Sequence, residues 1–257
     1  MSERHGRIAV ALADSVNMDD GDIKMKYLSL VFSVLFTVPV MAQNIIVGGT
    51  RFVYPANEKE ITISLTNSGD SPALAQVWLD NGDSSVAPEN INTPFVISPP
   101  MVRIDGSQAQ VIRIKAETKS AFPRDRESLL WLNVLDIPAS SEEAAKADVN
   151  ILEMAIRSRF KFFWRPAGLG DRQLALDKLE LRTAGRNATI INPTPFYITI
   201  GSLSRKAGPE LLGEAVMVAP KNQQTVSLTA AVSAGESLKL EEINDYGGIT
   251  STQIVTR

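Results

Sequence analysis

Two of the side chains most often used in catalysis, Cys and His, are almost missing from this chain of 257 residues. Cys is absent, which excludes thiol chemistry, and the single His is His5, which lies ahead of a predicted export signal. Ser-His-Asp catalysis is therefore excluded in the mature chain. Residue types alone leave a two-carboxylate hydrolase open, but Asp80 and Asp83 fall in a predicted polar loop without apolar surroundings or a defined partner. We expect no enzyme, no cofactor and no metal site.

The net charge of the chain does not point to a class of ligand either. The chain has 26 Lys and Arg against 29 Asp and Glu, a net charge of -3. Such a balance gives no long-range field for nucleic acid or for an acidic membrane surface. The chemistry that remains is recognition by particular side chains on particular strands, so the strands have to be located first.

Residues 151–166 alternate between apolar and polar for longer than an ordinary strand of about five or six residues. One parity is an apolar row, interrupted only by Ser158, and the other carries mostly charge. The apolar row consists of Leu152, Met154, Ile156, Phe160, Phe162 and Trp164, and the other parity holds Glu153, Arg157, Arg159, Lys161 and Arg165. Two interpretations are open: the apolar row covers a core beneath a solvated basic face, or part of it stays exposed for a partner strand.

Residues 25–42 have the features of a secretory signal peptide. A single Lys26 precedes an apolar run over 27–38, and Pro39 comes before a cleavage site at Ala42. The run is shorter than the roughly 20 residues that a membrane-spanning helix needs, so we expect export and no membrane insertion. We expect residues 1–24 to be a non-native or mis-annotated extension ahead of the true start at Met25, and the mature protein to hold its fold without disulfides.

The rest of the chain reads as short strands separated by turns. The first strand, 44–54, is interrupted at Gly48-Gly49, where a bulge or a crossover between sheets is expected. About seven strands up to residue 164 predict an immunoglobulin-like sandwich, and the pattern restarts after a hinge of linker composition at 165–170. The sequence therefore predicts an all-β protein with domains at 43–164 and 171–257. The other expected strands are 58–67, 74–79, 95–97, 102–104, 111–115, 128–137, 174–181, 188–191, 196–203, 215–218, 225–228, 237–243 and 253–255.

Six short strings, taken in order, resemble the PapD-like periplasmic pilus chaperones. They are Gly49 to Tyr54, Asp125 to Ser128, Leu132-Asn133, Lys161 to Pro166, Asn192 to Phe196 and Ile243 to Gly248, and the resemblance covers essentially all of 43–257. It implies two immunoglobulin-like β-sandwich domains arranged as an L or boomerang, with a pilin bound along the cleft side of the first. It also implies a periplasmic protein of fimbrium biogenesis and cell wall organization, with an outer-membrane usher as second partner.

The resemblance implies an anchor for the pilin's terminal carboxylate, which by motif falls on Arg51 and Lys161. A guanidinium can hold a carboxylate with two parallel hydrogen bonds while an ammonium adds a compact charge. The alternative is that both residues are ordinary solvated strand charges. The resemblance further implies that Glu127, Arg165 and Asp245 form an ionic contact between the two domains, which would fix the angle of the cleft.

In this family the strand that matches 151–161 completes a pilin that lacks its final strand. Leu152, Met154 and Ile156 would then enter the pilin's core. Ile156 and Lys161 are separated by an odd number of positions, so a bulge or strong twist near Ser158 is needed if they are to share a face. Self-association of the free chaperone, to hide this strand, is left open.

The connection 138–150 is of moderate length, and the chain lacks the Cys pair usual in the long-loop class. By resemblance this favours the short-loop class, which serves rod-like pili. The rival function is a secreted immunoglobulin-like fibre subunit or adhesive binding module. Two complete sets of strands and the pair Arg51 and Lys161 favour a chaperone over such a subunit.

Overall fold

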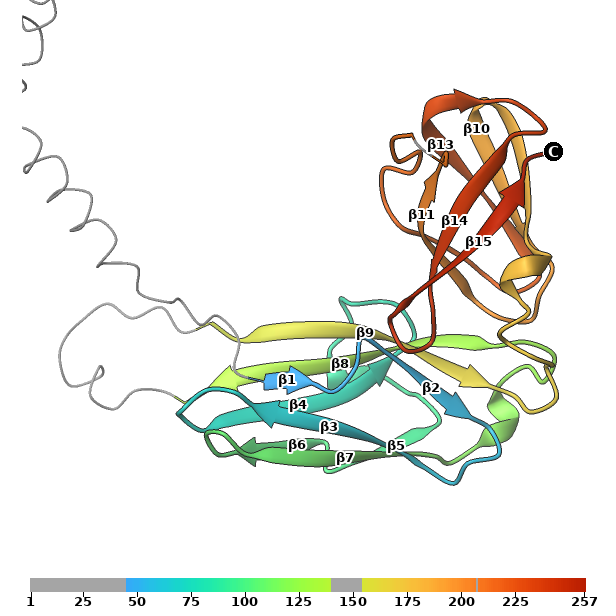
Figure 1. Ribbon diagram of the computed structural model, residues 1–257. Coiled ribbons are helices and arrows are strands. Elements are labelled where there is room, and N and C mark those ends of the chain that lie inside the picture. The colour runs from blue at the N-terminus through green and yellow to red at the C-terminus, as the bar shows by residue number, and fades with distance from the viewer. Residues whose placement is uncertain (1–44, 140–153, 207) are drawn as a thin grey trace, which may run out of the picture. The chain divides into compact units, whose positions relative to one another are not determined.

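The computed structural model describes residues 45–139, 154–206 and 208–257 (Figure 1). The predicted extension at 1–24, the predicted signal peptide at 25–42 and Leu152 lie outside the described residues, as does most of the 138–150 connection. Among the described residues, no helix is long and apolar enough to span a membrane. The same residues contain no group of three or more His, Cys, Asp or Glu placed to hold a metal ion.

The first domain consists of two facing β-sheets, as predicted. All strand pairs are antiparallel except that between β2 and β9, which is parallel. Two 3-10 turns, η1 (Pro88–Asn90) and η2 (Lys119–Ala121), lie in its loops. One sheet has the order β1 (Ile45–Val47), β3 (Ile61–Asn67), β7 (Ala109–Ala116), β5 (Phe95–Ser98), and the other β2 (Arg51–Pro55), β9 (Ile156–Arg165), β8 (Ser128–Pro138), β4 (Ala73–Asp80), β6 (Met101–Ile104).

The crossover predicted at Gly48-Gly49 is confirmed. β1 pairs with β3 in one sheet, whereas β2 pairs with β9 in the other. Between them the Gly48 amide still donates to the Ser64 carbonyl over 2.9 Å, and a Cβ on Gly48 would lie only 3.3 Å from that oxygen. The close backbone approach explains why the chain changes sheets at a glycine, and it places Arg51 at the start of β2.

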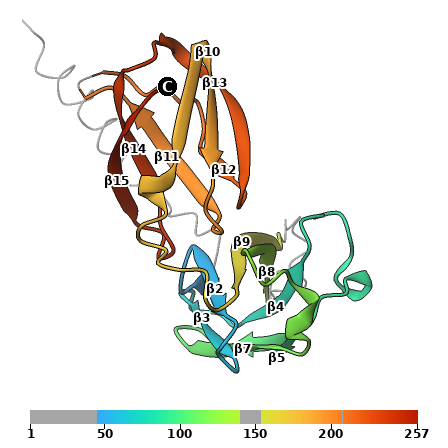
Figure 2. The ribbon, with the colours of Figure 1, turned by 90° about the vertical axis from the view of Figure 1, so that its right-hand side faces the viewer.

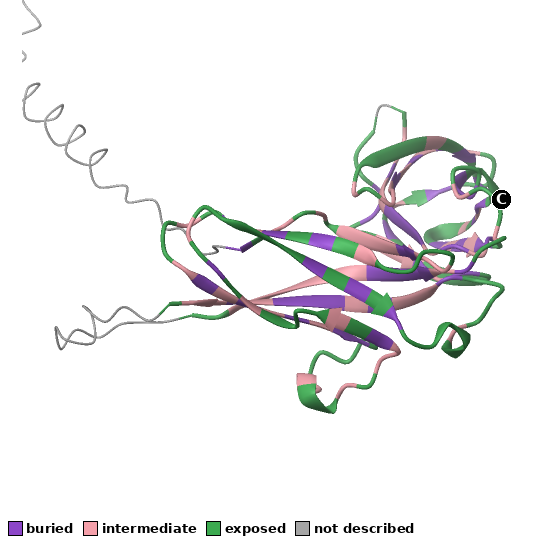
Figure 3. Ribbon diagram, turned by 90° about the horizontal axis from the view of Figure 1, so that it is seen from below, coloured by how far each residue is buried: buried purple, intermediate pink, exposed green. Residues whose placement is uncertain are grey.

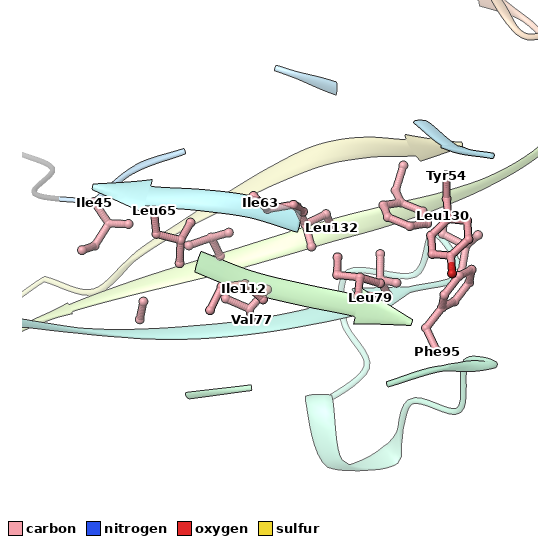
Figure 4. Close-up of a cluster of buried hydrophobic side chains, with 14 of the residues drawn as sticks. Ile45, Tyr54, Ile63, Leu65, Val77, Leu79, Phe95, Ile112, Leu130 and Leu132 are labelled. Carbon is pink, nitrogen blue, oxygen red and sulfur yellow. The ribbon is translucent and has the colours of Figure 1, made fainter. Parts of the chain in front are cut away.

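The core of the first domain is formed by side chains of one parity from each sheet, which Figure 3 shows as alternating buried and exposed residues along the strands. Ile63, Leu65, Val77 and Leu132 meet between the sheets (Figure 4). Each fully buried aliphatic side chain contributes about 1.5–3 kcal/mol. At one end, Tyr54, Phe95, Phe162 and Trp164 form an aromatic cluster with ring centroids 5.1 to 6.3 Å apart.

The second domain is a smaller sandwich with its own core (Figure 2). Its sheets have the orders β10 (Glu180–Asn192), β13 (Asn222–Val232) and β12 (Val216–Val218), β11 (Ile198–Ser204), β14 (Ser237–Ile243), β15 (Ile249–Val255). Two expectations are corrected here. The predicted strand 174–181 is mostly not a strand, since the turn η3 (Leu176–Lys178) occupies its middle, and only its last two residues belong to β10, which also contains all of the predicted strand 188–191. Leu176 and Leu179 are both buried, and a tight turn, unlike a strand, brings residues three apart to one side.

Candidate functional site

Arg51 and Lys161 lie side by side on neighbouring strands. They form the first pair of the parallel ladder between β2 and β9. The Arg51 Nη1 donates to the Ile243 carbonyl over 2.6 Å, and the Lys161 Nζ lies 3.5 Å from the Thr199 hydroxyl. In the described part of the chain, no carboxylate oxygen lies within 4.0 Å of either cation. We call Arg51 and Lys161 the anchor pair.

The surroundings of the anchor pair disfavour its positive charge. Burial lowers the pKa of the Lys161 ammonium, and the neighbouring charge of Arg51 lowers it further. Burial also lowers the pKa of the Arg51 guanidinium, although the charges of Asp245 and Glu242 oppose that effect. The two cations together carry more hydrogen-bond donors than the surrounding residues supply acceptors. The site therefore suits an added anion with two oxygens.

β9 runs without a break in register. Its pairing with β8 extends from Asp136 opposite Ile156 to Ser128 opposite Trp164, with no shift between. A bulge near Ser158, one of the two ways in which Ile156 and Lys161 could share a face, is therefore absent, and the two residues point to opposite faces of the sheet. A regular strand suffices because the two groups need not share a face: one side of β9 can present apolar side chains while the other presents the cation.

The apolar row is divided between two environments. Phe162 and Trp164 are buried in the core of the first domain, and Phe160 packs against it, so this half of the apolar row covers a core, as the first of the two interpretations has it. Met154, just ahead of β9, is 55% exposed, and Ile156 is half-buried. In the described part of the chain, no strand pairs with the β2 side of β9 ahead of Lys161. Exposed apolar side chains and an open sheet edge thus occur together.

The structure brings Glu127, Arg165 and Asp245 together. Arg165 Nε lies 2.6 Å from the Glu127 carboxylate, and its Nη1 lies 2.8 Å from that of Asp245. Glu127, whose side chain is only 1% exposed, also accepts from the Tyr197 amide over 2.7 Å. Arg165, the last residue of β9, therefore bridges Glu127 of the first domain and Asp245 of the second through charge-assisted hydrogen bonds.

The turn that carries Asp245 is held close to the anchor pair. Gly247 has a φ of 80°, and a Cβ at this position would lie 2.1 Å from the Thr50 hydroxyl. Only glycine satisfies both conditions. Arg172, which the sequence analysis did not single out, forms ion pairs with Glu242 and, at 3.8 Å, with Asp245. No sequence pattern marks Arg172, because its partners lie about 70 residues along the chain.

The placement of Asp80 in a loop without partners is wrong. Asp80 is the last residue of β4, its side chain is 1% exposed, and Arg159 Nη2 donates to its carboxylate over 2.7 Å. The neighbouring Asp83 does lie in an exposed loop, where it accepts hydrogen bonds from Ser85. The side-chain partners of Asp80 come from strands 53 to 79 positions away in sequence, which a local pattern cannot reveal.

Comparison with known proteins places this geometry in a family. Residues 44–170 match the family described as "Pili and flagellar-assembly chaperone, PapD N-terminal domain", and residues 174–254 match "Pili assembly chaperone PapD, C-terminal domain". The chaperone protein MrkB of Klebsiella pneumoniae is 47% identical over 233 residues, covering 91% of this chain and 100% of that protein. The chaperone protein HifB of Haemophilus influenzae is 36% identical over 233 residues, covering 88% and 95%.

Solved structures agree with these sequence relatives. The Pseudomonas aeruginosa CupB2 chaperone superposes with a TM-score of 0.70 at 34% identity, covering 82% of this chain and 100% of that one. A chain of the Salmonella enterica complex between the SafA pilin and the SafB chaperone superposes with a TM-score of 0.70 at 26% identity, covering 84% and 98%. Two immunoglobulin-like domains, matched in order over almost all of residues 44–254, lead to one conclusion: the chain belongs to the PapD-like family of pilus assembly chaperones.

Proposed function

We propose that this protein captures pilin subunits in the periplasm, supplies each with the strand that it lacks, and delivers it to an outer-membrane usher. The single observation that carries the proposal is the anchor pair: Arg51 and Lys161 are adjacent and half-buried, and the described residues place no carboxylate within 4.0 Å of them. The terminal carboxylate of a pilin would supply the missing acceptor. A guanidinium and an ammonium together match its two oxygens.

β9 then supplies the strand. Its open edge offers backbone groups to a sheet that lacks a strand, and Met154 and Ile156 offer apolar side chains to its core, as would Leu152. Each aliphatic side chain that becomes fully buried contributes about 1.5–3 kcal/mol, less the cost of ordering it. Chaperone and pilin complexes are an established case of strand addition.

The anchor pair would set the register of this pairing. A slip of one residue would turn the apolar side chains away from the pilin's groove. Seven positions separate Met154 from Lys161, and a strand rises about 3.3 Å per residue, so the two sites lie roughly 23 Å apart along β9. The proposal therefore requires that the last seven or so residues of the pilin pair with β9.

The remaining assignments are extensions of the same proposal. Glu127, Arg165 and Asp245 would keep the two domains in one orientation, and their short contacts support that role. The absence of Cys favours the short-loop class that serves rod-like pili. Self-association of the free protein through the open edge of β9 would protect the strand when no pilin is bound.

Removal of either anchor cation tests the proposal. Arg51→Ala and Lys161→Ala are each co-expressed with a pilin that co-purifies with the natural protein, and the amount of co-purified pilin is quantified. Losing one partner of a partly buried charge pair costs about 2–5 kcal/mol, so we expect at least about a 30-fold loss of affinity. Circular dichroism and thermal unfolding should change little, because neither side chain belongs to a core cluster.

Arg113→Ala and Lys115→Ala are matched controls. Both residues are exposed on β7, on the sheet that does not contain β9, so they remove the same charges from the same domain. The controls should capture pilin normally. Normal capture by both anchor variants would refute the proposal.

A further inference from the structure

Asp80 is an almost completely buried acidic residue on the face of its sheet opposite the core. Its carboxylate accepts from Arg159 Nη2 over 2.7 and 2.9 Å, from Asn133 Nδ2 over 2.7 Å and from the Gly82 amide over 2.7 Å. Arg157 Nη2 lies 3.4 Å away. Four donor groups occupy both oxygens, so the carboxylate is saturated within the domain and is not available to a ligand.

These contacts connect three strands. Asp80 ends β4, Asn133 belongs to β8, and Arg157 and Arg159 belong to β9, strands that lie side by side in Figure 1. Arg157 Nε and Arg159 Nε both donate to the Asn133 side-chain oxygen, over 2.9 and 3.2 Å. We call these four residues the Asp80 cluster. The cluster holds β9 across β8 to β4.

Both guanidinium groups of the cluster have further contacts that keep them in place. Arg157 lies 4.9 Å from the centre of the Trp78 ring, and Arg159 lies 4.8 Å from that of Trp131. Arg157 Nη1 donates to the Ser84 carbonyl over 2.8 Å. Neither arginine can leave without exposing an aromatic ring and reducing the charge compensation of a buried carboxylate, which is costly.

The cluster acts on the part of β9 that has least support. Residues 157 and 159 lie between exposed Met154 and the anchor residue Lys161, ahead of the point where β2 begins to pair with β9. A strand at the border of a sheet opens locally more readily than a central one, and any disorder there has to be removed on binding. Arg157 and Arg159 have the parity opposite to Met154 and Ile156. The cluster therefore holds β9 through side chains on the face that also carries Lys161, and it leaves the side chains of Met154 and Ile156 and the open edge of β9 for a subunit.

We propose that Asp80 is a positioning residue for capture: through Arg157 and Arg159 it keeps β9 extended and in register before a subunit arrives. This inference rests on the proposed function of β9 as the donated strand. With its side chain 1% exposed, Asp80 acts without touching the subunit. Nothing in the pattern of 151–166 indicated this role, because the basic parity of the strand looked like a solvated face.

Hydrogen exchange of the free protein tests the proposal directly. Asp80→Asn keeps the shape of the side chain but removes the charge that compensates both arginines. We expect backbone amides of residues 156–160 to exchange at least about tenfold faster in this variant, with β5, β7 and the second domain changed by less than about twofold. Asp83→Asn is the matched control, since Asp83 is exposed three positions away and should leave every segment unchanged.

Unchanged exchange in β9, or equal acceleration throughout the first domain, would overturn the proposal. If Asp80→Asn does not fold, Arg157→Gln carries the same comparison, because it keeps the Arg159 to Asp80 pair. In Arg157→Gln we expect the amides of residues 156–160 to exchange about threefold faster than in the natural protein. Unchanged exchange would count against the proposal.

Capture of the co-expressed pilin separates this inference from the proposed function. Asp80→Asn should slow association about tenfold, while dissociation of the formed complex changes by less than about threefold, because the pilin itself then orders β9. If Asp80→Asn associates with pilin as fast as the natural protein while Arg51→Ala loses capture, the positioning role of Asp80 is contradicted and the proposed function is not. Normal capture in Arg51→Ala and Lys161→Ala would instead contradict the proposed function.

Discussion

Lys161 is the residue whose charge state the proposed capture depends on most directly. Its pKa is lowered from the ordinary 10.5 by burial and by Arg51. A bound carboxylate would raise this pKa again, since an opposite charge favours the ammonium. The affinity for pilin should therefore be highest at pH values below the pKa of Lys161 in the free protein. It should be lost as pH rises through the pKa of Lys161 in the complex.

The pH dependence can be measured as the affinity for pilin from pH 7 to about pH 11. Lys161→Arg is the control, because arginine stays charged over this range. We expect the alkaline loss of affinity in the natural protein and a nearly flat profile in Lys161→Arg. The same loss in both proteins would show that a group other than Lys161 is responsible.

At this scale the sequence predicted the residues that belong to short motifs and missed those that do not. Arg51 and Lys161 lie in strings shared with the family, and the structure places them in one ladder pair. Asp80 and Arg172 have side-chain partners 53 to 79 positions away, and no local pattern connects them. Such contacts depend on which strands become neighbours, which only the folded topology determines.

β9 is the element that combines a core strand and a binding strand. Its second half carries Phe162 and Trp164 into the core, while the exposed Met154 precedes its first residue. Met154→Asp would place a carboxylate in the apolar groove of a pilin, where burial without a partner is costly. We expect at least about a tenfold loss of captured pilin with unfolding unchanged within about 0.5 kcal/mol, because exposed positions contribute little to stability.

Met101→Asp is the matched control for this prediction. Met101 is 48% exposed on β6, at the opposite border of the same sheet from β2. Its variant should capture pilin as the natural protein does. Equal losses in Met154→Asp and Met101→Asp would show a general effect of added charge, and would remove the assignment of Met154 to the donated row.

Alternation predicted most strands because it follows directly from burial of one face of a strand and exposure of the other, but it missed residues that belong to a strand only through their backbone pairing. β13 begins at Asn222, although the pattern predicted 225–228, since the polar residues Asn222, Gln223 and Gln224 pair with β10. Backbone hydrogen bonds define such a strand whatever its side chains. A bulge or strong twist near Ser158 was needed only if Ile156 and Lys161 shared a face, and the pairing of β9 with β8 shows no bulge there.

The two domains have separate cores joined by specific contacts. Besides the Arg165 bridges, Phe163 and Tyr197 have ring centroids 5.6 Å apart, and Arg51 donates to the Ile243 carbonyl. Both members of the anchor pair therefore contact the second domain, Arg51 through the Ile243 carbonyl and Lys161 through the Thr199 hydroxyl. The sequence predicted Glu127, Arg165 and Asp245 through the family resemblance, whereas the ion pair between Asp125 and Lys221, at 2.6 Å, was missed because both residues are ordinary loop charges.

The structure of this protein co-purified with its pilin would test the whole account most directly. The account predicts that the pilin's terminal carboxylate lies within hydrogen-bonding distance of Arg51 and Lys161. It also predicts that β9 pairs through its open edge with a strand of the pilin, and that Met154 is buried in the pilin's core. A terminal carboxylate far from both cations, or a complex in which β9 makes no strand pairing with the pilin, would contradict it.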